Sequence, residues 1–305
     1  MKSFDILAAG EINPDLVLTG DVIPAFGQAE QLVNSASFSI GSSSAIFACG
    51  AARLGLKLGF IGICGDDLFG HFMLDEMAHR QVDTTPVIVD PSVQTGMSVI
   101  LSAPTDRSIL THVGSMDRLR ADQVTDELLA RSRHLHVASY FLQTALQPGL
   151  PDLFRRAHAL GLSTSLDPNW DPSGKWSGFD ELLPFVDVFL PNRNEAQALS
   201  GSPGIEQALA LLTQKCRWVG IKMGAEGAIA GSGSETSICP AFNVEVVDTT
   251  GAGDSFDGGF LYGFLNGWSL ERSLKLGVAC GSLSTRKSGG TTAQATLDEA
   301  LQFVD

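Results

Sequence analysis

The chain has 305 residues, of which 44 % are hydrophobic and 18 % are charged, a composition that argues against disorder and allows one large core. A formal net charge of −14 without a Lys or Arg cluster argues against a nucleic-acid partner, because a phosphate backbone would be repelled. Five scattered cysteines without a C-x-x-C pair argue against a disulfide framework or a zinc site. We expect free thiols in a reducing cytoplasm.

The first predicted strand is the apolar stretch near the N-terminus. It is too short for a signal peptide and no basic segment precedes it, so we expect a cytoplasmic protein without a membrane partner. Further apolar runs then alternate with helical patterns. The expected strands are 4–9, 58–64, 134–138, 162–166, 186–190 and 218–222, and the expected helices are 45–54, 68–80, 150–160 and 194–199. Such alternation predicts a doubly wound α/β fold with a mostly parallel sheet covered by helices on both faces.

Two stretches, 16–38 and 94–111, interrupt this alternation. In the second, two strand-like runs flank a turn at residues 104–107, which is typical of a hairpin. We expect a single domain over 1–305 with a small β-stranded lid lobe, whose strands are inserted at about 12–38 and 93–112. Edge pairing of lid strands is one route to a homodimer.

Polar residues follow several predicted strands, at the positions where ligands bind in open α/β sheets. These segments are 167–169, 192–195, 222–224 and 248–254.

The segment 248–254 (DTTGAGD) carries the strongest chemical signal. It lies between an expected strand at 244–247 and a helical pattern that ends at 266–267. The small residues Gly251, Ala252 and Gly253 would let backbone N–H groups hold a phosphoryl group at the helix N-terminus, with Asp254 placed as a base. The alternative is that Asp254 only favours the helix dipole and that the glycines serve packing. A Walker A sequence and a G-x-G-x-x-G after a strand are both absent from the sequence.

Residues 248–261 (DTTGAGDSFDGGFL) resemble the C-terminal signature of the ribokinase-like (PfkB-type) carbohydrate kinases. Residues 41–55 resemble the N-terminal signature of that family, 65–70 (GDDLFG) follow at the expected place, and 192–195 (NRNE) are similar to its N-x-x-E motif. The resemblance covers nearly the whole chain. It implies ATP-dependent phosphorylation of a hydroxyl group on a small sugar or sugar derivative.

The resemblance also implies roles for individual residues. Asp254 would be the base, Gly251 to Gly253 the anion hole, and Glu195 with Asn192 would order Mg²⁺ and its water molecules near the phosphates. Without the resemblance, Asn192 and Glu195 would be read as a helix cap with a following acid.

The segment 222–227 is similar to the family's K-x-G-x-x-G turn, so the resemblance implies that Lys222, Gly224 and Gly227 lie where the backbone passes the ribose and adenine of ATP. Segment 285–290 resembles the stretch that closes the nucleotide pocket and contributes to a monovalent-cation loop. A bound K⁺ would strengthen the anion hole electrostatically. The residues implied for that cation are Asp248, Thr250, Ser284, Lys287 and Gly289.

Asp15 corresponds to the family's sugar-binding aspartate, and Asn13 would assist it. The alternative for Asp15 is a turn acid after Pro14. The resemblance also places Gly41, Ser42 and Ile46 at the substrate, and here the sequence departs from the family. The family usually has two adjacent glycines and then, four positions on, an asparagine.

A second departure is Asp171, at a position where many sugar-acid kinases of the family carry arginine. Both departures concern the identity of the substrate. The alternatives are a nucleoside kinase, in which Tyr140 and Phe141 stack on a base, and a protein of the same fold that senses a ligand without turnover. His134 and His136 lie in one strand without a third ligand nearby in sequence, which favours a structural role over metal binding.

Overall fold

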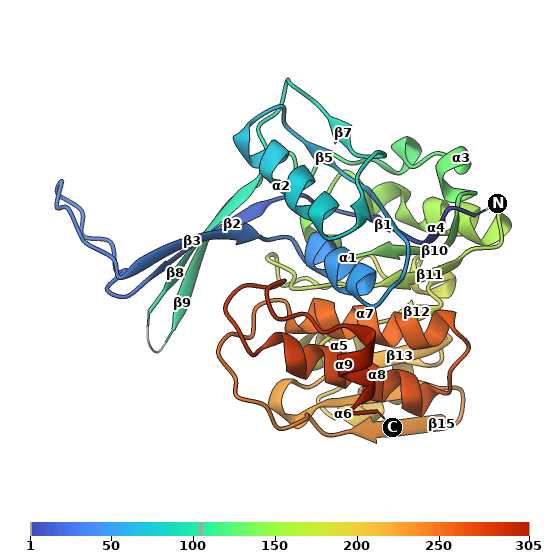
Figure 1. Cartoon of the computed structure of the whole chain (residues 1–305). Coiled ribbons are helices and arrows are strands. Elements are labelled where there is room, and N and C mark those ends of the chain that lie inside the picture. Colours follow the sequence, from blue (N-terminus) through green and yellow to red (C-terminus); the bar gives the residue numbers. More distant parts are fainter. Residues whose placement is uncertain (1, 104–105, 305) are drawn as a thin grey trace.

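The centre of the molecule is a nine-stranded sheet with the order β15-β14-β13-β12-β11-β10-β1-β4-β6 (Figure 1). The computed structural model describes residues 2–103 and 106–304, so the expected turn at 104–105 lies outside the described residues. Neighbouring strands from β6 to β13 are parallel, and only β14 and β15 join antiparallel. The mostly parallel sheet predicted from the sequence is therefore confirmed. Its strands are β1 Phe4–Ala9, β4 Leu58–Ile61, β6 Val82–Asp83, β10 Ser132–Val137, β11 Ser163–Leu166, β12 Val188–Phe189, β13 Trp218–Lys222, β14 Ala228–Ser232 and β15 Glu235–Cys239.

Helices cover both faces of this sheet, because each helix buries an apolar side against it. On one face pack α1 (Ser43–Arg53), α2 (Leu68–His79), α7 (Ala252–Leu265) and α8 (Leu270–Ser284). On the other pack α3 (Asp126–Leu129), α4 (Leu150–Ala159), α5 (Arg193–Ser200) and α6 (Ile205–Leu212). The C-terminal helix α9 (Leu297–Leu301) packs beside α8. Short 3-10 turns lie at Ala121–Gln123, Tyr140–Leu142, Gln147–Gly149, Leu183–Phe185 and Gly224–Glu226.

Side-chain caps set where several of these helices begin. The side chains of Ser42, Asp67 and Ser269 accept hydrogen bonds from backbone N–H groups in the first turns of α1, α2 and α8. Two glycines end the predicted helices. Gly55 and Gly161 follow α1 and α4 with φ of +95° and +76°, a conformation that glycine adopts without steric cost.

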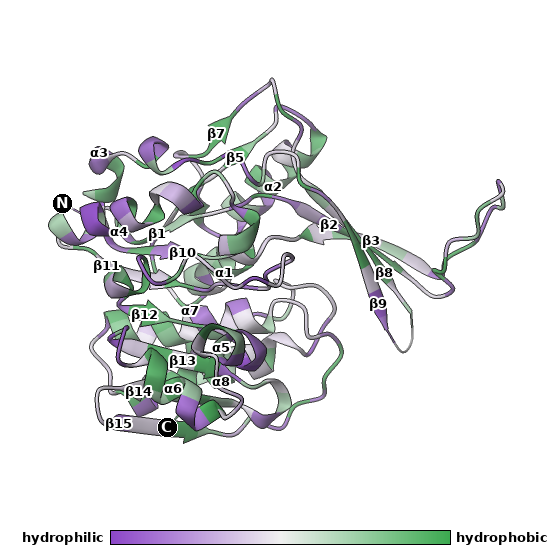
Figure 2. Ribbon diagram, turned by 180° about the vertical axis from the view of Figure 1, so that it is seen from behind, coloured by the Kyte–Doolittle hydropathy of each residue, from purple (hydrophilic) through white to green (hydrophobic). Residues whose placement is uncertain are grey.

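The lid lobe is a separate four-stranded sheet with the order β3-β2-β8-β9. Its strands are β2 Pro14–Thr19, β3 Ser35–Ile40, β8 Met97–Ser102 and β9 Arg107–His112, and a further small sheet pairs β5 Ile63–Cys64 with β7 Ile88–Val89. Phe38 packs on Phe72 of α2, with ring centroids 4.5 Å apart, which ties the lid to the main body. The loop between β2 and β3 projects far beyond the lid in both views (Figures 1 and 2).

The strand expected at 244–247 is not formed. Its backbone runs beside the end of α8, where the N–H groups of Val247 and Asp248 both donate to the Thr285 carbonyl, at 2.8 and 3.1 Å. Val246 and Val247 are each 60 % exposed, so no second strand covers this apolar run. Apolar character at these positions therefore reflects the cavity and the surface rather than a sheet.

The interior is strongly apolar, and Figure 2 shows the central strands β12 and β13 in the hydrophobic colours. All five cysteines are buried and free. Burial raises the pKa of the Cys49 and Cys280 thiols to about 12. Within residues 2–103 and 106–304, no helix combines the length and the apolarity that crossing a bilayer requires.

Candidate active site

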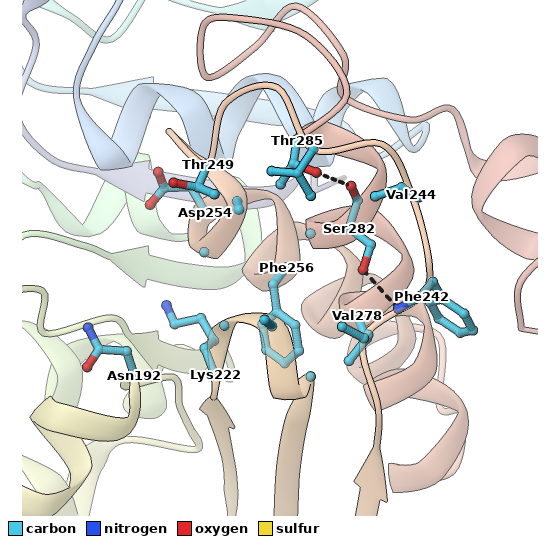
Figure 3. Close-up of a pocket in the computed structure, with 18 of the residues that line it drawn as sticks. Asn192, Lys222, Phe242, Val244, Thr249, Asp254, Phe256, Val278, Ser282 and Thr285 are labelled. Carbon is cyan, nitrogen blue, oxygen red and sulfur yellow. Dashed lines mark hydrogen bonds between the residues drawn. The ribbon is translucent and has the colours of Figure 1, made fainter. Parts of the chain in front are cut away.

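A cavity of about 590 Å³ opens where β11, β12 and β13 end, and it has a polar end and an apolar end (Figure 3). We call it the active-site cavity. Its polar end carries Ser43, Asp167, Asn192, Glu195, Lys222 and Asp254. Its apolar end carries Phe242, Val244, Val246, Phe256 and Val278. The polar side chains expected after separate strands thus meet around one space.

The N-terminus of α7 forms one wall of the polar end. Ala252, Gly253 and Asp254 line the cavity, and no described side chain caps this helix start. Gly251 lies behind them with φ of +72°, where a Cβ atom would come within 2.8 Å of Gly290 Cα. Only glycine fits there. The turn therefore presents backbone N–H groups at the positive end of a 14-residue helix, which suits an anion.

Asp254 sits in the first turn of α7 and is 7 % exposed. The pKa of its carboxyl group is raised to about 7, because burial and the charge of Asp167 together outweigh the lowering effects of Lys222 and the Ser43 hydroxyl. Such a carboxylate is well matched to accept a proton near neutral pH.

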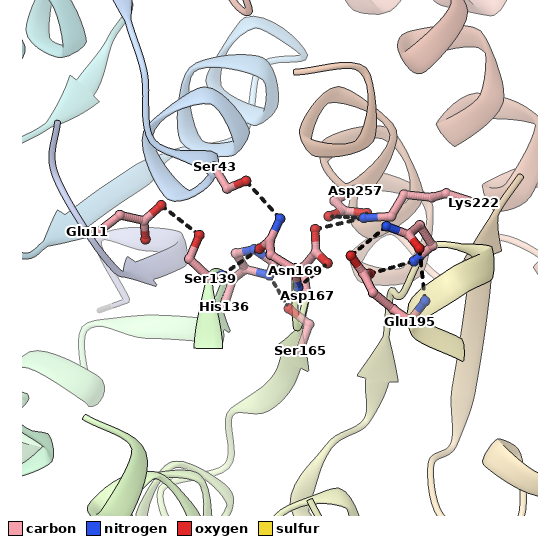
Figure 4. Close-up of polar contacts among 11 residues, drawn as sticks. Glu11, Ser43, His136, Ser139, Ser165, Asp167, Asn169, Glu195, Lys222 and Asp257 are labelled. Carbon is pink, nitrogen blue, oxygen red and sulfur yellow. Dashed lines mark hydrogen bonds and ion pairs between the residues drawn. The ribbon is translucent and has the colours of Figure 1, made fainter. Parts of the chain in front are cut away.

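Lys222 ends β13 and joins two carboxylates beneath the turn at residues 251–253. Its Nζ lies 2.7 Å from Asp167 Oδ2 and 3.2 Å from both carboxylate oxygens of Asp257, which follows Asp254 by one helical turn (Figure 4). Burial lowers the pKa of Lys222, but these two carboxylates raise it more strongly, so its final value is above the ordinary one. The ammonium group is charged.

Asn192 and Glu195 form a helix cap and also line the cavity. Asn192 Oδ1 accepts from Glu195 N at 3.0 Å, and Glu195 Oε2 accepts from Asn192 N at 2.8 Å, so the capping arrangement at the start of α5 is present. Burial and the charge of Asp167 raise the pKa of Glu195 to about 7. A carboxylate and an amide oxygen at the cavity are ligands of the type Mg²⁺ binds, directly or through water.

The K-x-G-x-x-G turn forms the floor between the polar and apolar ends. Gly224 and Gly227 line the cavity and have φ of +60° and +93°. A Cβ atom at Gly227 would lie 2.0 Å from the Cys239 carbonyl oxygen, so glycine is required for the turn to pass β15.

The residues expected around a monovalent cation are brought together only in part. Asp248 Oδ2 accepts from Gly289 N at 2.9 Å, and Asp248 Oδ1 accepts from Thr250 N at 2.9 Å. Ser284 instead donates to the Gly281 carbonyl, and the Lys287 side chain is exposed. Asp248 therefore joins the two loops that flank the turn at residues 251–253.

Three residues expected at the sugar lie together at the base of the lid. Gly41 N donates to the Asn13 carbonyl at 3.1 Å, and a Cβ atom at Gly41 would lie 2.3 Å from Asp15 Oδ1. Asn13 is 3 % exposed, and its Oδ1 meets no donor among the described residues. Burial raises the pKa of Asp15 to about 6, against the opposing charge of Arg107. These groups offer hydrogen-bond acceptors to a ligand.

Ser42 and Ile46, the positions that depart from the family signature, serve the scaffold in this structure. Ser42 has φ of +64°, and its hydroxyl donates to the Glu11 carbonyl at 2.7 Å. Ile46 is 3 % exposed and packs under the turn at residues 251–253, where it is a neighbour that a Cβ atom at Gly251 or Gly290 would meet. Ile46 is not among the described residues that line the cavity.

A buried polar network that the sequence did not reveal links the lid base to the polar end of the cavity (Figure 4). Glu11 Oε2 accepts from Ser44 Oγ at 2.7 Å, and Glu11 Oε1 accepts from Ser139 Oγ at 2.9 Å. Asn169 Nδ2 donates to Ser43 Oγ at 3.0 Å. Asn169 could have been predicted as a site residue because it follows an expected strand. The sequence around Glu11 has no feature that indicates its part in the network.

The remaining candidates lie outside the cavity. His134 bonds to Ser163 and Ser165, and His136 bonds to Ser165, so both imidazoles belong to the sheet interior. Tyr140 is 5 % exposed and packs on Phe179, with Phe141 beside it. Asp171 accepts from Ser173 N and Trp176 N and so holds its own loop.

Comparison with known proteins gives one family over nearly the whole chain. The model of the pfkB family of carbohydrate kinases matches residues 3–297. The chain is 29 % identical to ribokinase of Haemophilus influenzae, over 97 % of each protein, and 30 % identical to 5-dehydro-2-deoxygluconokinase of Bacillus subtilis, over 100 % of this chain and 97 % of that protein. The crystal structure of a putative ribokinase II from E. coli in complex with ATP and Mg²⁺ superposes with a TM-score of 0.87 at 25 % identity, over 99 % of each chain.

Proposed function

The chain belongs to the pfkB family of carbohydrate kinases, and from that premise we propose that it transfers the γ-phosphoryl group of ATP to a hydroxyl group of a small sugar or sugar derivative, with Asp254 as the base. One observation carries the proposal. A buried carboxylate with a pKa of about 7 stands in the first turn of an uncapped helix whose N–H groups face the same cavity. This pairs a base with an anion hole.

The two ends of the cavity suit the two ends of a nucleotide. Adenine would lie at the apolar end between Val244, Phe242 and Val278, with the turn at Gly224 and Gly227 beneath the ribose. The phosphates would then reach the polar end and the turn at Gly253. The E. coli protein of similar fold was crystallised in complex with ATP and Mg²⁺, which supports ATP as the ligand of this cavity.

The chemical step follows from this placement. The sugar oxygen attacks the γ-phosphorus while its proton passes to the Asp254 carboxylate. The bond between the γ-phosphorus and the bridging oxygen breaks, and ADP leaves with that electron pair. N–H groups of the turn at Gly251 to Gly253 would stabilise the charge on the transferred group. Asp254 then releases its proton to solvent.

Two cations fit residues of the site. Glu195 and Asn192 would hold Mg²⁺ through water molecules, and the loops joined by Asp248, together with Thr250 and Gly289, would hold K⁺ through oxygen atoms. When bound, these ions supply positive charge to phosphates in an acidic protein. Asp248 already accepts two backbone N–H groups, so it orders the loops rather than offering an open carboxylate.

We propose Asn13 and Asp15 as the ligands of the sugar hydroxyls, with Gly41 leaving the space for them. D-ribose is not the acceptor we expect to be preferred. Where the family has asparagine, Ile46 can neither donate nor accept, and an unsatisfied buried hydroxyl costs about 1–3 kcal/mol, or roughly 10–150-fold in specificity. Because Ile46 packs beneath the turn and does not line the cavity, the loss would come from the absence of an asparagine amide at this position and not from a contact between Ile46 and the sugar.

A coupled ADP-release assay tests the proposed function. The panel is D-ribose, D-fructose, deoxy sugars, 2-keto-3-deoxygluconate and nucleosides, with kcat/KM compared across them. Turnover of one sugar is the expected result. A nucleoside at the head of the ranking identifies a nucleoside kinase, and ATP binding without any turnover identifies a ligand-sensing protein. D-ribose at the head contradicts the role given to Ile46.

The lid is the proposed site of a homodimer. Strand β9 is an open edge of the lid sheet and is exposed along its whole length. In the projecting loop, Ile23, Phe26 and Leu32 are 75 %, 99 % and 83 % exposed. Light scattering after size exclusion, on the natural chain and on Phe26→Ser, decides whether the lid associates.

A further inference from the structure

We propose that Glu11 is a positioning residue of the reaction, which acts through a chain of hydrogen bonds on the side chain that holds the Asp254 carboxylate. This inference rests on the proposed function and names a further residue for it. Glu11 is 2 % exposed and is not among the described residues that line the cavity. Its effect on the reaction must therefore pass through its neighbours.

The chain of hydrogen bonds crosses the carboxyl ends of three neighbouring strands. Glu11, Ser139 and Asn169 follow β1, β10 and β11, which lie side by side in the sheet. Glu11 Oε1 accepts from Ser139 Oγ at 2.9 Å, and Ser139 N donates to Asn169 Oδ1 at 2.6 Å. Asn169 Nδ2 donates to Ser43 Oγ at 3.0 Å, and Figure 4 shows the chain as far as this point. The Ser43 hydroxyl in turn hydrogen-bonds to the Asp254 carboxylate, so the chain ends at the proposed base.

The direction of these hydrogen bonds is fixed by the groups that make them. A backbone N–H group can only donate, so Ser139 N requires the oxygen of the Asn169 amide to face it. The amide nitrogen then faces Ser43, whose oxygen accepts from it. The hydroxyl proton of Ser43 is left to donate to Asp254. A displacement of Ser139 would therefore reach the hydroxyl group that holds the base.

Backbone strain is concentrated along the same chain. Ser42, Ser139 and Asn169 have φ of +64°, +52° and +53°, and they are three of the six described non-glycine residues with positive φ. Such a conformation is costly for serine and persists only where the surroundings hold it. Glu11 holds both serines, because its carbonyl accepts from Ser42 Oγ at 2.7 Å and its carboxylate accepts from Ser139 Oγ. Clustered strain of this kind is typical of functional sites.

The alternative is that Glu11 only fills the interior and acts on Asp254 by its charge. The two roles predict opposite shifts of the pKa of Asp254 when Glu11 is replaced. The charge of Glu11 raises that pKa, whereas the hydrogen bond from Ser43 lowers it and has the larger effect. The other charged groups that face Asp254, which substitutions at Glu11 leave in place, are Asp167, Lys222 and Asp257.

A matched pair of substitutions separates the two roles. Glu11→Gln and Glu11→Met both remove the charge and keep the length of the side chain, but only the amide can still hydrogen-bond to the Ser139 hydroxyl. We expect Glu11→Gln to keep kcat close to that of the natural chain and to move the midpoint of its pH dependence to lower pH. We expect Glu11→Met to lower kcat by about tenfold to 10²-fold with KM for ATP unchanged, and to place the midpoint above that of Glu11→Gln. Equal kcat and equal midpoints in the two variants overturn the proposal.

Ser139→Ala guards against loss of folding in Glu11→Met. It removes the hydroxyl that joins Glu11 to the chain and leaves every charge in place, so we expect a lower kcat and a midpoint above that of the natural chain. Ser273→Ala is the control, because Ser273 is also buried and its hydroxyl donates to the Ser269 carbonyl at 2.9 Å, outside the cavity. If Ser139→Ala lowers only the melting temperature, Glu11 has a structural role alone and the proposal is wrong.

Titration of the Asp254 carboxyl carbon by NMR, without substrate, measures the same pKa independently of turnover. We expect the pKa to increase in the order Glu11→Gln, natural chain, Ser139→Ala. If this order is found but the natural chain phosphorylates no acceptor, the proposed function fails and the link between Glu11 and Asp254 stands. If the natural chain is active and the order is absent, the link is wrong and the proposed function stands.

Discussion

The guanidinium group of Arg107 reaches from the lid to the loop before α7, where its Nη1 lies 3.5 Å from Thr250 Oγ1. Arg107 also lowers the pKa of Asp15, which burial raises to about 6. One arginine of the edge strand β9 thus lies near both Thr250 and Asp15, the proposed sugar ligand.

Replacing Arg107 by Ala should weaken sugar binding more at pH 6 than at pH 8. Without the arginine the pKa of Asp15 rises further, so at pH 6 more of the carboxyl group is protonated and accepts fewer hydrogen bonds. We expect KM for the sugar to rise about tenfold at pH 6, the size of losing a charged hydrogen bond. Arg120→Ala, an exposed arginine paired with Asp122, is the control. An equal rise at both pH values would contradict the link to Asp15.

Replacing Asp254 by Asn should lower turnover by about 10²-fold or more, with ATP binding retained, because the positioned base is lost. The control is Asp298→Asn, which removes another first-turn acid, in α9. Similar turnover in both variants would mean that Asp254 only favours the helix dipole. Steady-state kinetics and calorimetry give the two readouts.

The pH dependence of kcat at saturating sugar should show an ascending limb with a midpoint near pH 7. Asp254 must be ionised to accept the proton, and its pKa is raised to about 7. Lys222 lowers that pKa, so Lys222→Met should move the midpoint to higher pH. A limb near pH 4 would show that Asp254 has an ordinary pKa or is not the base.

The same shift predicts an effect on stability. In the unfolded chain Asp254 titrates near about pH 4, so the folded protein holds the extra proton between about pH 4 and 7. The raised pKa of Asp254 contributes fully to the stability of the folded protein below about pH 4, and this contribution is lost as the pH rises through about 7. Asp254→Asn should therefore gain stability relative to the natural chain as the pH increases from 4 to 8. Denaturant unfolding at these two values measures the difference.

Replacing Gly253 by Val should leave the fold intact but lower kcat by about 10²–10³-fold, because the side chain would occupy the phosphate position. The nearest atoms to a Cβ there belong to Lys222, at 3.5 Å, so the backbone is not strained. Gly204→Val is the control, since a Cβ at Gly204 also has room, at 3.8 Å from Gln207. Near-normal kcat in the Gly253 variant would remove this turn from the anion hole.

Activity should require Mg²⁺ and should rise with K⁺, because both ions offset charge around the phosphates. Titrating KCl against choline chloride at constant ionic strength measures the K⁺ effect. Asp248→Asn should weaken the response, since Asp248 joins the two loops concerned. A flat response to K⁺ would eliminate the monovalent site.

Local signals were sufficient for the layers of the fold and for the turn at 251–254. Alternation predicted the parallel sheet, and glycines with an acid at a helix start predicted the turn that begins α7, whose binding of an anion stays a prediction. Contacts between distant segments were not predictable. The sequence around Lys222 does not indicate that its ammonium group donates to Asp167 and Asp257, which lie 55 and 35 positions away. Ile46 was expected at the sugar from its place in a motif, but its side chain direction depends on how α1 packs under Gly251 and Gly290.

The buried cysteines have a practical consequence for following the motions of this protein. Each thiol is shielded in the closed fold, and a raised pKa leaves little thiolate to react. A thiol reagent added under native conditions can therefore modify a cysteine only after the region around it has opened. Cys49 in α1, Cys216 before β13 and Cys280 in α8 lie in different parts of the molecule. Their separate labelling rates measure how often each part opens, and the change in those rates on adding nucleotide reports which part the nucleotide closes.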